Sequence, residues 1–189
     1  MSKPPSGTLT FLFTDIECST QLWQKLPDRM KINMARHDEI LREAIESNRG
    51  YVFKTVGDEF CAAFAAAGDA LQAAITAQRS LCAQAWGDAT IKVRMGLHTG
   101  NAELQANGDY SGYESLSRIQ RLTSAGYGGQ TLLSQETRDL VQADLPEGVS
   151  LCDLGQHCLK DLIHPEHIYQ VNISGLVGEF PALKTLDGQ

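Results

Sequence analysis

Apolar residues along this chain occur in short runs typical of strands, interleaved with stretches in which they recur at helical spacing. Residues 8–13 (TLTFLF) are rich in β-branched and aromatic side chains, and they predict a buried central strand that leads to Asp15. Residues 22–48 carry apolar side chains at helical spacing, with an interruption at Pro27 and Asp28. We therefore expect two helices here, the first capped from within residues 18–20 and the second capped by Asp28.

The remaining pattern extends this alternation of strands and helices to the end of the chain. The expected strands are 51–55, 60–64, 91–100, 101–105, 130–134, 149–154 and 167–173, and the expected helices are 67–86, 112–124 and 135–141. Strand–helix–strand–strand–helix–strand within this order predicts an α+β fold of the ferredoxin-like (split βαβ) kind, a palm-type sheet with helices packed on one face. A fold of this kind does not by itself establish a chemistry.

Composition favours a single cytoplasmic domain. The chain has 189 residues and a formal net charge of −7, which argues against a nucleic-acid partner or a broad membrane-binding surface. No apolar run approaches the roughly 20 residues that a membrane span requires. The five cysteines show no CxxC spacing, and we expect reduced thiols. We expect a disordered lead-in (1–6), one catalytic domain (7–174) and a C-terminal tail (175–189).

Two acidic residues stand where a metal site could form. Asp15 lies at the end of the first strand, and Asp58 lies at the tip of the hairpin formed by the next two strands. In a palm-type sheet these positions lie side by side, and two such carboxylates can hold two divalent ions about 4 Å apart. The alternatives are an Asp15 that caps a helix and a Gly57–Asp58 pair that only makes a turn.

Other charged residues could contact a nucleotide. Lys54 and Asp109 could present one donor and one acceptor to a base edge, a pattern that fits adenine and also cytosine. The alternatives are a surface lysine and a turn aspartate. Arg121 could stabilise charge on a transferring phosphate, and Arg118, one helical turn earlier, competes for that role. Lys160 is an ordinary loop lysine unless a triphosphate lies near it.

Six stretches, taken together and in this order, resemble the catalytic domain of class III nucleotidyl cyclases over roughly residues 7–173. They are FLFTDIECST (11–20), KTVGDEF (54–60), VRMGLHTG (93–100), GDYSG (108–112), SAGYGGQTLLS (124–134) and LKDL (159–162). The resemblance implies a head-to-tail homodimer with active sites shared between protomers. It also implies attack of a ribose 3′-hydroxyl on the α-phosphate, giving a 3′,5′-cyclic nucleotide and pyrophosphate.

The resemblance also implies roles for individual residues. Asp15 and Asp58 of one protomer would hold two Mg²⁺ or Mn²⁺ ions per active site, and Lys54 and Asp109 of the other would read the base, as in members that use ATP. The remaining implied contacts are to phosphate, from the backbone around Glu17, Cys18 and Ser19, from Lys160, and from Arg121 in the transition state.

One departure keeps other functions open. The family usually has VNxAARL on the helix after DYxG, with an Asn that orients the ribose and an Arg four residues later, whereas this chain has SLSRIQRL at 115–122. Counting forward puts Leu116 and Gln120 at these positions; counting backward puts Ser117 and Arg121 there, which we prefer because a cation is kept. Loss of one such donor can lower the rate by about 10²–10³-fold.

Adenylate cyclase activity is the first expectation. The alternatives are a pyrimidine (UTP or CTP) nucleotide cyclase of the kind used in bacterial anti-phage signalling, and a degenerate domain that binds nucleotide and regulates a partner. A guanylate cyclase is less expected, since guanine would require an acceptor at the position of Lys54.

Overall fold

The computed structural model describes residues 4–186 of the chain. Its strands are β1 (Thr8–Ile16), β2 (Tyr51–Val56), β3 (Glu59–Phe64), β4 (Val93–Asn101), β5 (Glu103–Leu104), β6 (Tyr110–Ser111), β7 (Thr131–Ser134), β8 (Val149–His157) and β9 (Glu166–Ile173). Its helices are α1 (Ser19–Lys25), α2 (Pro27–Ser47), α3 (Ala67–Ala83), α4 (Tyr113–Ala125) and α5 (Gln135–Val141). Parts of the expected lead-in (1–6) and tail (175–189) lie outside the described residues. No helix within 4–186 is long and apolar enough to cross a membrane.

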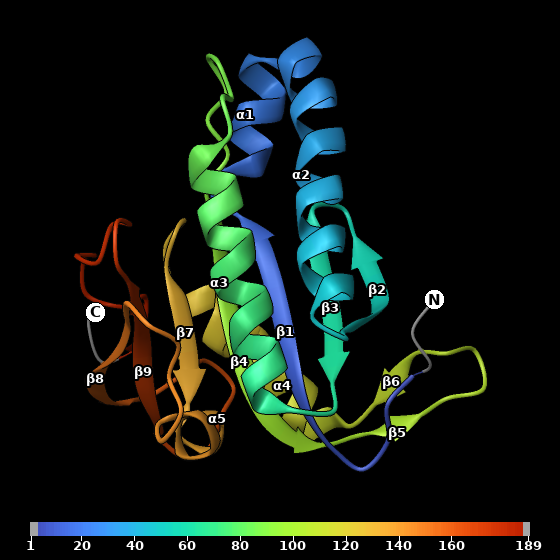
Figure 1. Ribbon diagram of the computed structural model, residues 1–189, viewed down its shortest axis with the longest axis vertical. Helices are drawn as coiled ribbons and strands as arrows, with labels where there is room; N and C mark the ends of the chain where they lie inside the picture. The colour runs from blue at the N-terminus through green and yellow to red at the C-terminus, as the bar shows by residue number, and fades with distance from the viewer. Residues whose placement is uncertain (1–3, 187–189) are drawn as a thin grey trace.

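Seven strands form one mixed sheet in the order β2-β3-β1-β4-β7-β9-β8 (Figure 1). β4 and β7 run parallel and all other neighbours run antiparallel. β5 and the unpredicted two-residue β6 make a separate ribbon. The predicted central strand is confirmed, because β1 lies between β3 and β4 and is buried over residues 9–14. The palm-type α+β architecture is therefore as expected.

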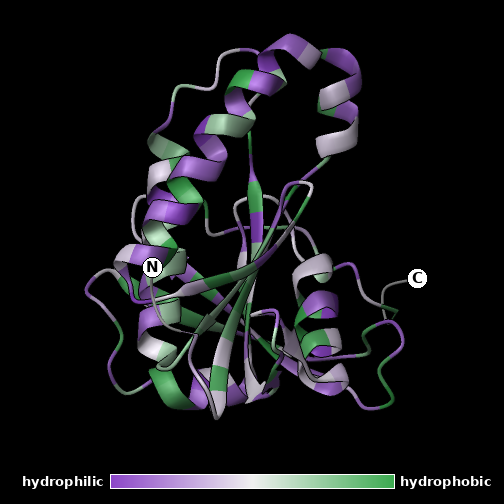
Figure 2. Ribbon diagram, turned by 90° about the vertical axis from the view of Figure 1, so that its right-hand side faces the viewer, coloured by the Kyte–Doolittle hydropathy of each residue, from purple (hydrophilic) through white to green (hydrophobic). Residues whose placement is uncertain are grey.

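The helices cover both faces of the sheet, so the expectation that they pack on one face is wrong for α4. Leu12 and Ile16 of β1 belong to the core that α2 and α3 share. Phe11 and Phe13 point to the other face and pack with Ile119 of α4. Figure 2 shows the strands between helices on either side. The two sets of β1 side chains separate because successive residues of a strand face opposite ways.

α4 lies against two glycines of β4. A Cβ added to Gly96 would lie 2.3 Å from the Thr123 hydroxyl oxygen, and one added to Gly100 would lie 2.4 Å from the Ser115 hydroxyl oxygen. Any larger side chain at either position would push the helix away from the sheet. The missing side chains thus allow the helix backbone to approach β4 closely, and this contact fixes the position of α4.

One helix has its N-cap within the expected residues but lacks a side-chain cap bond, and the expected cap of the other is wrong. α1 begins at Ser19, and Cys18 before it has a left-handed backbone with φ of 57° and no side-chain cap. α2 begins at Pro27, because the fixed φ of proline suits the first helical position and its missing N–H loses no bond there. Asp28 therefore lies inside the first turn and is not the cap.

Candidate functional site

The end of β1 and the tip of the β2–β3 hairpin meet at one edge of the sheet. The Asp58 carboxylate Oδ2 accepts a hydrogen bond of 2.8 Å from the backbone N–H of Ile16, the residue that follows Asp15. Both carboxylates are partly buried. The structure thus brings together the two acidic residues that the sequence singled out, and we call Asp15 and Asp58 the acidic edge.

Arg94 of β4 forms an ion pair with the acidic edge. It is a site residue that was not predicted from the sequence. Its Nε donates to Asp15 Oδ2 at 2.7 Å and its Nη2 makes a second contact with the same oxygen. Its Nη1 donates to the backbone carbonyl of Ser124 in α4 at 3.3 Å. One guanidinium therefore ties the acidic edge to the helix. The signal that could have found it is the β1–β4 register, which pairs Asp15 with Arg94.

The surroundings of Asp15 disfavour the charged form of its carboxyl group. Burial raises the pKa of its carboxyl group above the usual value, Arg94 opposes the rise, and Asp58 and Glu59 add to it. A partly buried pair of carboxylates that needs a compensating positive charge suits a divalent cation. Mg²⁺ commonly takes one or two protein carboxylates and completes its shell with water or substrate phosphate. A cation at the acidic edge would have these two carboxylates as its side-chain ligands, since within residues 4–186 no group of three or more His, Cys, Asp or Glu could hold a metal.

Lys54 and Asp109 also lie together. The Lys54 Nζ is 3.7 Å from Asp109 Oδ2, although the residues belong to β2 and to the turn before β6. The Tyr51 hydroxyl donates to the carbonyl of Gly108 at 3.1 Å and holds that turn against β2. Tyr110 packs edge-to-face against Phe53 on the same side. A donor and an acceptor are thereby held side by side.

Lys54 lines a groove of about 460 Å³ between the β2–β3 hairpin and α4. Arg121, Ser117 and Gln120 line it from the helix, and Phe53 lines it from β2. Asp15 and Asp58 do not line this groove. The acidic edge and the groove are therefore two distinct features of the chain.

The two candidate arginines face different surroundings. Arg121 lies on the groove side, and its Nη2 donates to Asp161 Oδ2 at 2.5 Å. Asp161 follows Lys160 in the turn between β8 and β9, so this contact brings the exposed Lys160 turn against α4. Arg118 lies away from the groove and pairs with three carboxylates at 3.1 to 3.3 Å, those of Glu114, Glu136 and Glu166. These ion pairs are typical of an arginine that stabilises the fold and does not bind substrate.

The surroundings of α4 residues can be compared with the two possible alignments of this helix to the family motif. Leu116 packs against the apolar cluster under the groove, and Gln120 Nε2 donates to Glu59 Oε1 at 3.1 Å. Ser117 and Arg121, one turn apart, leave a hydroxyl and a guanidinium on the groove. Both counts place their residues on the groove, because Leu116 and Gln120 line it together with Ser117 and Arg121, and the preference for the second count stays a prediction.

Residues 17–19 were expected to bind phosphate through their backbone N–H groups, and one of these groups already has a partner within the protein. The backbone N–H of Glu17 donates to the carbonyl of Lys92 at 2.9 Å. Cys18 is exposed with a left-handed backbone, and Ser19 is the first residue of α1. Of these three residues, Cys18 and Ser19 stay the candidates for backbone contact with a phosphate.

A palm-type sheet with two acidic residues at one edge, together with a groove lined by Lys54 and Arg121, is an arrangement that suits nucleotidyl transfer. The chain belongs to the adenylate and guanylate cyclase catalytic domain family, whose model matches residues 1–172.

Individual relatives agree with this membership. An uncharacterized protein of Mycobacterium tuberculosis is 40% identical over 184 residues, which cover 96% of this chain and 62% of that protein. The adenylate cyclase of Neurospora crassa is 26% identical over 231 residues, 93% of this chain and 10% of that enzyme. A structure of a Trypanosoma brucei adenylate cyclase in its monomeric state superimposes with a TM-score of 0.86 at 26% identity, covering 97% of this chain and 95% of that one. The chain thus spans less than two thirds of these mycobacterial and fungal relatives.

Proposed function

We propose that this chain is an adenylate cyclase that converts ATP to 3′,5′-cyclic AMP and pyrophosphate. The observation that carries the proposal is the Lys54–Asp109 contact at 3.7 Å beside a groove that Arg121 also lines. Adenine offers an acceptor at N1 and a donor at its amino group, and this lysine and aspartate complement both. Relatives named adenylate cyclase support the same substrate.

Asp15 and Asp58 would hold two Mg²⁺ or Mn²⁺ ions. When bound, such ions lower the pKa of an attacking hydroxyl and neutralise charge on the leaving pyrophosphate. Arg94, released from Asp15 by a bound cation, would remain beside the edge as a donor for phosphate oxygens. Arg121 would stabilise charge that grows on the α-phosphate. Lys160, in the turn that contacts Arg121 through Asp161, would meet the triphosphate.

The working enzyme would be a head-to-tail homodimer. One chain keeps the acidic edge apart from the groove of Lys54 and Arg121. A second copy, related by a two-fold axis, would place its groove over the first copy's edge and would complete two equivalent sites. In this pairing the groove of one chain would bind the base of the nucleotide, and the acidic edge of the other chain would bind its phosphates through the metal ions.

A pyrimidine cyclase is the second candidate, because a lysine and an aspartate side by side also complement cytosine. The test is incubation with ATP, GTP, CTP and UTP separately in the presence of Mn²⁺, with products identified by mass. We expect cyclic AMP as the main product. Cyclic CMP or UMP would overturn the choice of ATP. Nucleotide binding without any product would show a degenerate domain that regulates a partner.

A further inference from the structure

The C-terminal segment packs against the domain beyond the last residue that the family model matches. Leu183 is 8% exposed and joins a buried cluster that includes Leu122 of α4 and Leu159 of the Lys160 turn. The backbone N–H of Lys184 donates to the carbonyl of Ala125 at 2.9 Å. We call residues 176–186 the strap, and its far end touches both α4 and the turn after β8.

Lys184 connects the strap to the end of β1. Its Nζ lies 3.6 Å from Glu17 Oε1, donates to the carbonyl of Gly126 at 3.1 Å, and lies 4.1 Å from the centre of the Tyr127 ring. The Tyr127 hydroxyl in turn donates to the carbonyl of Ala182 at 2.8 Å. Glu17 lies two residues after Asp15, so this cluster is attached directly to the acidic edge.

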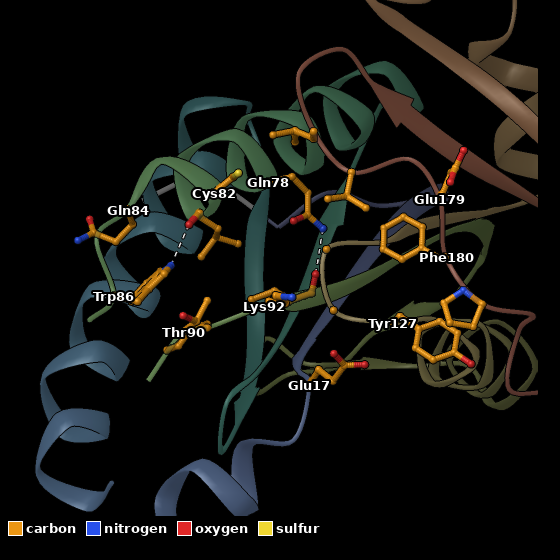
Figure 3. Close-up of a pocket in the computed structure, with 18 residues that line it drawn as sticks. Glu17, Gln78, Cys82, Gln84, Trp86, Thr90, Lys92, Tyr127, Glu179 and Phe180 are labelled. Atoms are coloured by element: carbon orange, nitrogen blue, oxygen red, sulfur yellow. Dashed lines mark hydrogen bonds between the residues drawn. The ribbon is translucent and has the colours of Figure 1, made fainter. Parts of the chain in front are cut away.

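The rest of the strap covers a cavity, so its side chains are not closely packed against the domain on that side. The cavity has a volume of about 490 Å³ and lies between the end of α3 and strap residues 176, 177 and 179–181. Figure 3 shows Phe180 and Tyr127 on one side of it, Cys82 of α3 on another, and Glu17 at its border. The attachment of the strap therefore depends on contacts at its two ends. Near its start Gln170 Nε2 donates to the carbonyl of Gly178 at 2.7 Å. At its far end the strap is held by the Lys184 cluster, by the buried Leu183, and by the backbone N–H of Leu186, which donates to the carbonyl of Cys158 at 3.1 Å.

The turn at residues 17–19, which Lys184 contacts, contains a strained residue that its surroundings must stabilise. Cys18 has φ of 57°, a conformation that non-glycine residues keep only where their surroundings impose it. Glu17 is fixed from two sides, by its N–H bond to Lys92 and by its side-chain contact with Lys184. Since both side chains of the ion pair are partly exposed, the pair adds little to global stability. Its effect is local.

We propose that Lys184 is a positioning residue, which holds the turn at residues 17–19, and through it the acidic edge, from a segment outside the matched domain. The consequence for turnover rests on the proposed function; the position of the turn does not. Lys184 would act through Glu17, so removal of either side chain would release the same turn.

The first test is amide hydrogen exchange of Lys184→Met, with Lys184→Arg as the conservative variant and Lys31→Met on the exposed side of α2 as the matched control. We expect the Glu17 amide to exchange at least about threefold faster in Lys184→Met, with amides of the β2–β3 hairpin unchanged. Lys184→Arg and Lys31→Met should exchange like the wild type. An unchanged Glu17 amide, or an equal acceleration in the arginine variant, would overturn the proposal. Should Lys184→Met not fold, Glu17→Gln removes the same contact from the other side.

The second test is kinetic and uses a double-mutant cycle. We expect Lys184→Met to raise the half-saturating Mn²⁺ and ATP concentrations by about three- to tenfold, with a melting temperature close to that of the wild type. In a Glu17→Gln background the same substitution should have almost no further effect. Equal effects in both backgrounds would overturn the coupling. A protein without cyclase activity would sink the proposed function alone, because the exchange experiment still decides the role of Lys184.

Discussion

The Asp58 carboxylate accepts a hydrogen bond from the backbone N–H of Ile16, and this bond places Asp58 beside the end of β1 that carries Asp15. We predict that Asp15→Ala and Asp58→Ala each lower turnover by at least about 10²-fold, because bound metal supplies several kcal/mol of charge stabilisation. Mn²⁺ binding, measured by electron paramagnetic resonance, should weaken in both. Asp144→Ala, an exposed carboxylate far along the chain, is the control. Wild-type turnover in either variant would refute the metal assignment.

The separation of the acidic edge from the groove predicts that two inactive variants complement each other. Asp58→Ala damages the edge and Arg121→Ala damages the groove. Mixed dimers would contain one site with both defects and one intact site, so an equimolar mixture should regain about a quarter of wild-type activity. The measurement is cyclic nucleotide formation after mixing and re-equilibration. A mixture as inactive as its components would show that each site lies within one chain.

Arg121 and Arg118 differ in their surroundings, and their variants should differ in kind. Arg121→Ala should lower turnover by about 10²-fold with little change in melting temperature, because its guanidinium faces the groove. Arg118→Ala should lower the melting temperature instead, since it leaves three carboxylates without their cation. Both are compared well below their unfolding range. The reverse ranking of turnover would mean that Arg118, and not Arg121, stabilises the growing charge.

Ser117 offers a gain-of-function test. If it occupies the position at which the family places an asparagine, Ser117→Asn should raise turnover by at least about tenfold by restoring an orienting donor. Leu116→Asn is the matched variant, and it should lose activity and stability because Leu116 packs in the apolar cluster beneath. Steady-state kinetics with ATP and Mn²⁺ decide the matter. A gain in Leu116→Asn and not in Ser117→Asn would favour the other count.

His98 predicts how stability depends on pH. Burial lowers the pKa of its imidazole from 6.5 to about 4. Between these values the unfolded chain binds more protons than the folded one, so stability is full above pH 6.5 and falls as the pH drops toward about 4. His98→Asn, which keeps a polar group near the Ser134 hydroxyl, should flatten this fall in thermal unfolding. Burial also lowers the pKa of His37, so His37 contributes a slope of the same sign. An unchanged slope in His98→Asn would contradict the assignment.

Much of the fold could be predicted from local patterns. The β-branched and aromatic run at residues 8–13 indicated the central strand, and α5 was predicted with its observed bounds. The cap of α1 lies at Cys18, within the expected residues, but it makes no side-chain bond, and the cap of α2 was misplaced because Pro27 takes the first helical position and Leu26 precedes it. The face that α4 covers could not be predicted, since it depends on Gly96 and Gly100 lying on the same side of β4 as Phe11 does of β1.

The site was predictable only where motif and local chemistry coincided. Asp58 and Asp109 stand at turns, where an acidic residue is visible in the sequence. Arg94 was missed because its importance depends on the register between β1 and β4, which joins residues 79 positions apart. Lys184 was missed for the same reason, because an unremarkable lysine in a tail shows no pattern that points to Glu17.

The two sides of α4 tolerate change very differently. Ser115 and Thr123 lie so close to Gly100 and Gly96 that a single added carbon would displace the whole helix. Ser117, on the opposite side of the helix, lines the groove and does not face these glycines. The departure at Ser117 falls on this groove side, whereas Ile119, which replaces an alanine of the usual motif in the preferred count, is buried against the sheet.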